Sequence, residues 1–353
     1  MNKLKMALLL NNIKEILPGL IVSVVIAIAA YFIGYGLEHL VGLHLIGGSV
    51  IALFIGVTIN FFWCPKCLKK GLDFASKKLL KFAIILLGGS LSVNMILTVG
   101  GQSLVVMVFT LLTCFGGGYI VGKLLKLDWK VSNLISAGTG ICGGSAIAAI
   151  SPVIDAEDND VAMAMSATFI FDMIMIVLFP IMGFALGLSD QAYGLWAGTA
   201  VNDTSSVVAA AGAFSEAAQE YAVMVKLTRT LSIIPVVLIF SFINMRIKRK
   251  NSNTEVVEKK KVNIVKIIPW FIVGFLLMAI LNSVGLFSES FSSSTKSVSS
   301  FIMIIALAAI GMKTSFKEMK ASGPRPMLHG FIISTLVVIV ALVVEIAMGL
   351  VTF

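Results

Sequence analysis

Five ionisable side chains stand inside long apolar stretches of this sequence, where a charge is unfavourable. They are Asp172, Asp203, Lys226, Arg229 and Glu345. A charge at the centre of a bilayer costs at least about 2.5 kcal/mol, so such groups usually mark a transport pathway or an internal ion pair. Lys226 and Arg229 are three residues apart, which places both on one helix face. They suit either an anionic substrate or carboxylate partners such as Asp172 and Asp203.

Two runs that begin with Ala-Gly-Thr interrupt the apolar sequence, at 137–145 and at 197–206. Backbone N–H and C=O groups that lack a helical hydrogen bond are tolerated in a bilayer only where protein or a water-filled cavity supplies a partner. A pair of such interruptions therefore predicts two broken or re-entrant helices that build a transporter binding site. The predicted substrate-binding residues are Thr139, Gly140, Gly143, Gly144, Ser145, Thr204, Ser205, Ser206, Lys226 and Arg229.

The two interruptions differ in chemistry. The first carries no charge, and its glycines free N–H groups that suit an anion at the start of a half-helix. The second has Asn202 and Asp203 followed by hydroxyl residues, and with Asp172 these predict a site for a coupling sodium ion or proton. Two plainer interpretations stay open: the glycines can serve close helix packing, and the oxygens can cap a helix. Glu345 is expected to reach a headgroup or a neighbouring polar atom.

The elements that position these residues are membrane helices. Of 353 residues, 58% are hydrophobic and only 13% charged, with a mean hydropathy of +1.01, which indicates an all-α integral membrane protein. We expect about eleven hydrophobic segments. They lie near 17–36, 44–63, 79–98, 102–122, 133–152, 160–188, 192–213, 219–244, 264–286, 297–312 and 327–351.

The formal charge of +9 comes from basic residues that cluster in short loops beside the apolar spans. Such loops set topology, so the charge indicates a multi-pass protein with a cytoplasmic N-terminus and gives no reason to expect nucleic acid. The charge bias leaves open whether segments 133–152 and 192–213 cross the membrane or re-enter it. We expect one membrane domain over 1–353. It divides into 1–245 with both interruptions, a charged cytoplasmic loop at 246–263, and the C-terminal helices at 264–353.

Other motifs have little chemistry to offer. Leu87-Gly88-Gly89-Ser90-Leu91-Ser92 resembles Ile310-Gly311-Met312-Lys313-Thr314-Ser315, and the spacing of the pair predicts an inverted repeat. Cys64 and Cys67 are expected in a plain juxtamembrane loop, and the three scattered histidines do not predict a metal site. No Walker, metalloprotease or nucleophile motif is present, so neither an enzyme nor a cofactor is expected.

A family resemblance rests on several of these stretches. They are Gly138-Thr139-Gly140-Ile141-Cys142-Gly143-Gly144-Ser145, Ala200-Val201-Asn202-Asp203-Thr204-Ser205-Ser206, Val225-Lys226-Leu227-Thr228-Arg229 and Pro269-Trp270-Phe271. In this order they resemble the YeiH family of bacterial inner-membrane proteins, labelled as sulfate exporters and similar to cation/proton antiporters and bile-acid symporters. The resemblance implies inverted five-helix repeats, two crossing broken helices, elevator-type movement and a homodimer.

These observations predict a secondary active transporter of a small anion, sulfate or an organic sulfonate, coupled to sodium or protons. One alternative is a sodium or proton exchanger with no anion substrate, in which Asp203 and Asp172 bind the transported ion. Another is a membrane sensor or scaffold that does not transport and that uses the charged loop as its partner surface. The expected partners are the anion, the lipid bilayer and a second copy of the chain.

Overall fold

The computed structural model describes residues 2–41, 48–63, 65–251, 269–313 and 323–351. Within these ranges the chain is helical and has no strand, which confirms the all-α class. Among the described residues, six helical stretches are long and apolar enough to cross a membrane. They are Lys14–Gly34, Val93–Leu124, Asp158–Ala185, Glu216–Ile247, Glu289–Lys313 and Pro324–Ala347.

One predicted pair of segments, 79–98 and 102–122, has the wrong boundary. The chain turns earlier, after α4 (Leu80–Gly88), and α5 (Val93–Leu112), η3 (Thr113–Gly117) and α6 (Gly118–Leu124) then follow without a break. The turn is fixed by two serines, because Ser90 Oγ bonds to Leu87 O at 2.8 Å and Ser92 Oγ accepts the N–H of Met95 at 3.2 Å. A hydroxyl that caps a helix start outweighs the apolar character of the flanking sequence.

Most of the predicted charged loop at 246–263 lies outside the described residues. The described part extends α13 (Ile233–Asn251) to residue 251. The chain forms two compact units, each built from three separated stretches. Unit 1 comprises 1–96, 208–219 and 270–316, and unit 2 comprises 97–207, 220–269 and 317–353.

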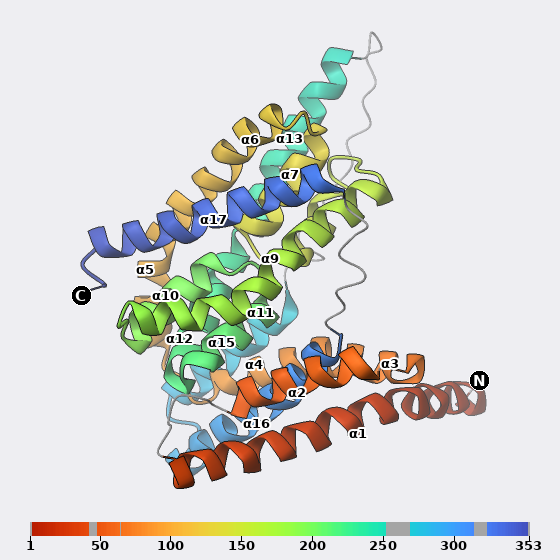
Figure 1. The fold of residues 1–353 in the computed structure, drawn as a ribbon, viewed down its shortest axis with the longest axis vertical. Coiled ribbons are helices and arrows are strands. Elements are labelled where there is room, and N and C mark those ends of the chain that lie inside the picture. Colours follow the sequence, from red (N-terminus) through yellow and green to blue (C-terminus); the bar gives the residue numbers. More distant parts are fainter. Residues whose placement is uncertain (1, 42–47, 64, 252–268, 314–322, 352–353) are drawn as a thin grey trace. The chain divides into compact units, whose positions relative to one another are not determined.

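Unit 1 is a set of closely packed helices that carries none of the five predicted intramembrane charges. Its helices are α1 (Asn2–Val41), α2 (Gly48–Phe62), α3 (Lys69–Asp73), α4, α15 (Trp270–Ser283) and α16 (Glu289–Lys313). In it α16 packs on α2 and α4, and α1 packs on α2 (Figure 1). The backbones touch at glycines: a Cβ on Gly311 would lie 2.2 Å from Leu53 O, and one on Gly56 would lie 2.5 Å from Ala308 O.

We expect Gly311→Ala to destabilise this unit, because neither backbone can retreat from the added methyl group. Overpacking of this kind lowers the free energy of unfolding by about 1–3 kcal/mol, which thermal unfolding of the detergent-solubilised protein would measure. Gly101→Ala is the control, since a Cβ there meets nothing within 4 Å. Equal midpoints for Gly311→Ala and Gly101→Ala would contradict the close packing of α2 and α16.

Unit 2 contains both Ala-Gly-Thr runs. Its helices include most of α5, with α6, α7 (Trp129–Gly140), α8 (Gly144–Ile150), α9 (Asp158–Ala185), α10 (Asp190–Ala200), α13 and α17 (Pro324–Ala347). In this unit α17 packs on α9, α7 and α10, and α9 packs on α7 (Figure 1). Helices α11 (Thr204–Phe214) and α12 (Glu216–Leu231) each contribute residues to both units.

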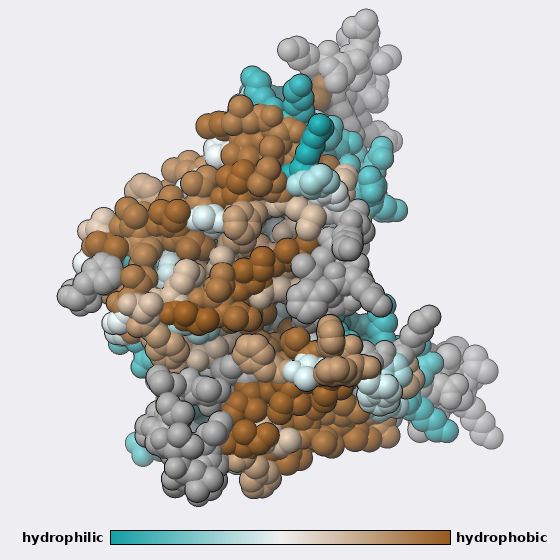
Figure 2. All heavy atoms as spheres, in the orientation of Figure 1, coloured by the Kyte–Doolittle hydropathy of each residue, from teal (hydrophilic) through white to brown (hydrophobic). Residues whose placement is uncertain are grey.

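Large apolar side chains remain exposed along the long helices. Among them are Phe169 and Ile181 on α9 and Phe331, Ile339 and Val343 on α17. Figure 2 shows such side chains over these helices and over α1, with hydrophilic residues gathered toward helix ends. This distribution is expected of helices whose outer faces contact lipid.

Candidate functional site

A helix ends and another begins within each Ala-Gly-Thr run. Helix α7 ends at Gly140 and α8 begins at Gly144, while α10 ends at Ala200 and α11 begins at Thr204. Gly143 has a φ of +64°, a left-handed conformation that favours glycine. A Cβ on Gly143 would lie 3.0 Å from Cβ of Asp203, so the two runs lie against one another inside unit 2.

The glycine of each Ala-Gly-Thr run serves close packing. A Cβ on Gly138 would lie 2.8 Å from Cγ2 of Thr168 on α9. A Cβ on Gly198 would lie 2.7 Å from the backbone oxygen of Ala222 on α12. These two glycines therefore bring the ends of α7 and α10 next to the helices that carry the charges.

Arg229 binds the carbonyl ends of both helices. Its Nε donates to Gly140 O and its Nη2 to Thr139 O, each at 2.7 Å, and its Nη1 donates to Thr199 O. Only 1% of its surface is exposed. The last carbonyls of a helix lack intrahelical partners and carry partial negative charge, so a buried guanidinium there satisfies both needs. The threonine of each Ala-Gly-Thr run thus offers its backbone oxygen to Arg229.

Lys226 completes the same arrangement one turn away. It is fully buried, and its Nζ donates to Val201 O, the carbonyl of the residue that follows α10, at 2.9 Å. The spacing of three residues predicted a shared face for Lys226 and Arg229, and both side chains do bind the C-terminal region of α10. The two cations therefore contact helix ends, and within the described chain neither forms an ion pair with a carboxylate.

Asp172 binds the opposite kind of helix end. From the middle of α9, its Oδ1 accepts the N–H of Asn202 at 2.9 Å and its Oδ2 accepts the N–H of Asp203 at 3.0 Å. These N–H groups directly precede α11, whose start carries partial positive charge. Asp172 is 1% exposed. A carboxylate of the protein itself therefore occupies N–H groups of the kind that bind anions.

Asp203 is the more accessible of the two acids. Its Oδ2 accepts the N–H of Ser205 at 2.9 Å and also the hydroxyl of Ser205, and its residue is partly exposed. The capping interpretation of this oxygen-rich run is thus seen in the geometry, because Asp203 holds the first turn of α11. Among the described residues no group of three or more His, Cys, Asp or Glu side chains could hold a metal ion.

The predicted substrate-binding residues divide into two layers. Six of them are buried: Thr139, Gly140, Gly143, Ser206, Lys226 and Arg229. The other four, which we call the rim together with Asp203, are the exposed Ser145 and the partly exposed Gly144, Thr204 and Ser205. The rim hydroxyls are thus more exposed than the buried Lys226 and Arg229.

Sequence reasoning missed Ser334, the serine of apolar α17. Its Oγ lies 3.4 Å from the hydroxyl of Thr139 and accepts the Nδ2 of Asn202 at 3.4 Å, so it joins the two runs. Asn202 Oδ1 is buried and accepts no hydrogen bond from the described chain. A lone serine in a transmembrane helix gives no signal in the sequence, because such residues commonly bond to their own helix.

Glu345 is not part of this cluster. It is fully buried on α17, and neither carboxylate oxygen accepts a hydrogen bond from a described residue. The expectation that it reaches a headgroup or a polar neighbour is therefore not met within the described chain.

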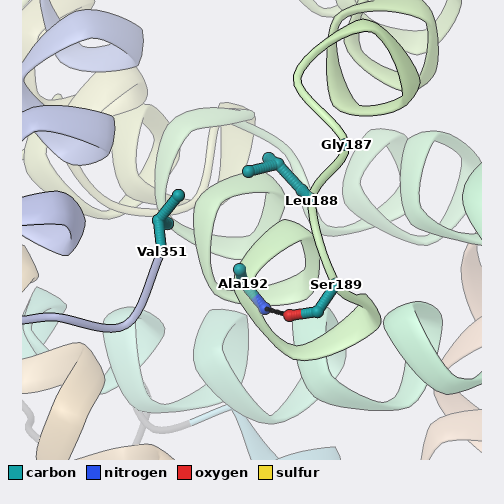
Figure 3. A pocket seen from close by; sticks show the side chains of 5 residues that line it. All are labelled: Gly187, Leu188, Ser189, Ala192 and Val351. Carbon is teal, nitrogen blue, oxygen red and sulfur yellow. Dashed lines mark hydrogen bonds between the residues drawn. The ribbon is translucent and has the colours of Figure 1, made fainter. Parts of the chain in front are cut away.

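A separate cavity of about 250 Å³ lies where the turn after α9 meets the C-terminal residues (Figure 3). Its lining is uncharged: Gly187, Leu188, Ser189, Ala192 and Val351.

Comparisons with known proteins cover almost the whole chain. The family described as conserved hypothetical protein 698 matches residues 18–330. A protein of Clostridium tetani called a UPF0324 membrane protein is 55% identical over 344 residues, which cover 96% of this chain and 99% of the relative. A UPF0324 membrane protein of Streptococcus agalactiae is 37% identical, with 95% and 98% covered. One of Fusobacterium nucleatum is 38% identical, with 89% and 93% covered.

Proposed function

This chain belongs to the family described as conserved hypothetical protein 698, whose relatives are named membrane proteins, and from that premise we propose that it is an ion-coupled secondary transporter of a small anion. Its residues that resemble the YeiH sulfate exporters favour sulfate or an organic sulfonate as the substrate. We place it in the bacterial inner membrane as a homodimer, with a cytoplasmic N-terminus set by the basic loops. No catalytic step and no resident cofactor enter the proposal.

One observation carries the proposal: two acids and two bases, all near the broken runs of unit 2, neutralise the ends of α7, α10 and α11. Two carboxylates and two cations leave the cluster with no net formal charge. An anion that enters such a buried neutral site adds one or two uncompensated charges, which is strongly unfavourable. Protons or sodium ions that enter with it, one for each charge of the anion, remove the penalty, and this requirement couples the two fluxes.

The route of the anion follows from the two layers of the site. It first meets the rim hydroxyls of Ser145, Thr204 and Ser205, which can donate hydrogen bonds to its oxygens. The backbone N–H groups of Asn202 and Asp203 lie behind them, held by Asp172. Protonation of Asp172 weakens its hold on these groups, so the anion can take its place there. Lys226 and Arg229 contribute positive potential from the helix ends that they bind.

A second candidate is a sodium or proton exchanger with no anion substrate. A specific observation favours it: Asp172 already fills the N–H groups that an anion needs. The partly exposed Asp203 would then bind the transported cation together with the hydroxyl of Ser205. The two candidates differ in whether any anion changes the cation flux.

Transport into liposomes tests the proposal. We expect liposomes that contain the purified protein to accumulate radiolabelled sulfate or methanesulfonate when a proton or sodium gradient is imposed. If protons are the coupling ion, the pH inside the liposomes should change only when one of these anions is present. The controls are protein-free liposomes and liposomes with the Arg229→Ala variant, and neither should take up the anion. A cation flux that is equal with and without either anion would replace the anion transporter by the exchanger.

The sensor or scaffold alternative makes a different prediction for the charged loop. A carrier should keep its flux when residues 252–261 are deleted, because no residue of the proposed site lies there. Loss of flux in that variant, with unchanged thermal stability, would favour a role for the loop as a partner surface.

A further inference from the structure

Glu345 is the one buried glutamate among the described residues, and the proposed binding site does not use it. It lies near the end of α17, inside a stretch that is long and apolar enough to cross a membrane. None of its surface is exposed, and neither carboxyl oxygen has a hydrogen-bond partner in the described chain. The charge that this carboxyl group can carry therefore depends on the helices around it.

Glu345 belongs to the face of α17 that packs into unit 2. Ser334, Val338 and Ala341 are also buried, and they precede Glu345 by eleven, seven and four residues. This spacing places all four side chains on one side of the helix. Ser334 contacts the first Ala-Gly-Thr run, and Glu345 lies about 17 Å further along the helix axis. Glu345 is thus a site apart from the ion-coupling acids.

Helix α10 runs antiparallel to this half of α17. Nε1 of Trp196 donates to Val338 O at 2.9 Å. Four residues earlier on α10, Ala192 lines the cavity of Figure 3 together with Val351. Glu345 stands between positions 338 and 351, so it is level with residues 192–196 of α10. The titratable side chains on α10, which cannot supply a positive charge, are the exposed Asp190 and the buried Tyr193.

Helix α9 runs parallel to α17. A Cβ on Gly330 would lie 3.2 Å from Cβ of Ala167, and Gly187, after the end of α9, lines the same cavity as Val351. Residues 173–185 of α9 therefore accompany the second half of α17. They contain no ionisable side chain, because every acid of α9 comes earlier in the helix. Neither α9 nor α10 contains a lysine, an arginine or a histidine.

The other helices that pack on α17 contact its first half. Ser132 of α7 and the backbone at Gly118 of α6 bind His329, and a Cβ on Gly117 of η3 would lie 3.7 Å from Cδ1 of Ile333. His329 precedes Glu345 by sixteen residues, about 24 Å along the axis. The titratable side chains on these helices and on α17 itself, which lie along that half, are Cys114, Tyr119, Lys123, Lys130, Arg325 and His329.

An ionised carboxylate is strongly unfavourable in such surroundings. It loses its hydration, and no counter-ion or hydrogen bond compensates for the loss. A bound proton removes the charge and gives one oxygen a donor hydrogen. A metal ion would need several more oxygen ligands, and among the described residues no group of three or more His, Cys, Asp or Glu side chains could hold one. The ligand that fits Glu345 is therefore a proton.

We propose that Glu345 is a proton-binding site of unit 2, occupied by a proton while α17 packs on α9 and α10 as it does in this structure. The carboxylate binds one proton as it is buried, and the acid releases that proton when water reaches it. The N–H of Leu350 donates to Glu345 O at 3.0 Å, so the cavity at Val351 lies beside the last turn of α17. A separation of α17 from α10 at this cavity would admit water and release the proton.

Infrared spectroscopy of the detergent-solubilised protein at neutral pH tests the site. We expect a C=O band of a protonated carboxyl group that shifts when the side-chain carboxyls of the glutamates carry carbon-13. The isotope separates this band from any aspartic acid without a substitution. The band should lose amplitude in Glu345→Gln, whose neutral side chain has nearly the shape of the protonated acid. Glu289→Gln, the same change at an exposed position of α16, should leave the band unchanged.

The pH dependence of unfolding gives a second measurement. A glutamate of the unfolded chain is ionised between about pH 6 and pH 8, so unfolding in this range releases the proton of Glu345. The native state then binds more protons than the unfolded state, and stability falls as the pH rises. We expect the unfolding equilibrium constant of the wild type to rise about tenfold more per pH unit than that of Glu345→Gln. Glu289→Gln should follow the wild type.

Each measurement can overturn the proposal. A wild-type spectrum without an isotope-sensitive band would do so, as would a band of equal amplitude in Glu345→Gln or an equal pH dependence of unfolding in the two proteins. If Glu345→Gln does not fold, the isotope shift in the wild type decides. The proposal goes beyond the proposed function, because failure of the protein to move sulfate or methanesulfonate in liposomes would leave these results unchanged.

Discussion

Arg229→Ala should abolish gradient-driven uptake of sulfate or methanesulfonate and should also destabilise the protein. The substitution leaves the backbone oxygens of Thr139, Gly140 and Thr199 without their guanidinium donor. A buried polar group that loses its partner costs about 1–3 kcal/mol. We therefore expect the free energy of unfolding to fall by at least about 3 kcal/mol, because three such groups are affected. Thermal unfolding in detergent and uptake by liposomes measure the two effects.

Two further variants show whether the three carbonyls are the cause. Arg325→Ala, at an exposed position near the start of α17, removes the same side chain and should change neither quantity. Arg229→Lys keeps the charge but not the planar set of donors, so it should recover part of the stability. A stable and fully active Arg229→Ala protein would show that the ends of α7 and α10 need no cation.

Asp172→Asn should reduce ion-coupled uptake to below about 1% of wild type. An amide has one acceptor oxygen, so it can hold the N–H of Asn202 or that of Asp203 while its own NH2 group opposes the other. It also leaves the buried cluster with one excess positive charge. We expect the free energy of unfolding to fall by about 2–4 kcal/mol. Uptake in liposomes and thermal unfolding check both numbers.

The control for this variant lies on the same helix. Asp158→Asn, in the exposed first turn of α9, makes the same chemical change away from the cluster and should leave uptake intact. If Asp172→Asn lost its stability but kept full coupling to the ion gradient, Asp172 would be a helix cap only. The coupling role would then pass to Asp203.

The sequence was informative where membrane physics leaves few choices. Apolar length predicted membrane helices, and the Ala-Gly-Thr runs predicted the places where helices end, at Gly140 and Ala200. The three-residue spacing of Lys226 and Arg229 predicted their shared face. Each of these inferences uses only neighbours in the chain, whose geometry is set by helical periodicity.

The partners of the charges could not be predicted in the same way. The sequence suggests carboxylates or a substrate anion as partners of Lys226 and Arg229, whereas in the structure both side chains bind backbone carbonyls. Every residue has a carbonyl, so the sequence does not mark which of them lack a partner. Ser334 could not be predicted for a related reason: its contacts span long separations in the chain, and one hydroxyl among the polar residues of an apolar helix is not distinctive.

The cations on carbonyl ends and the carboxylates on N–H ends restrict which changes of charge the protein can accept. In a simple ion pair the two residues can trade places, because each needs only the opposite sign in front of it. Here the sign at each position is dictated by the direction in which the neighbouring backbone runs. An exchange of Asp172 with Lys226 would set a cation against donors and an anion against acceptors. Neither natural mutation nor design can therefore exchange the signs of these charges and keep the helix ends stabilised.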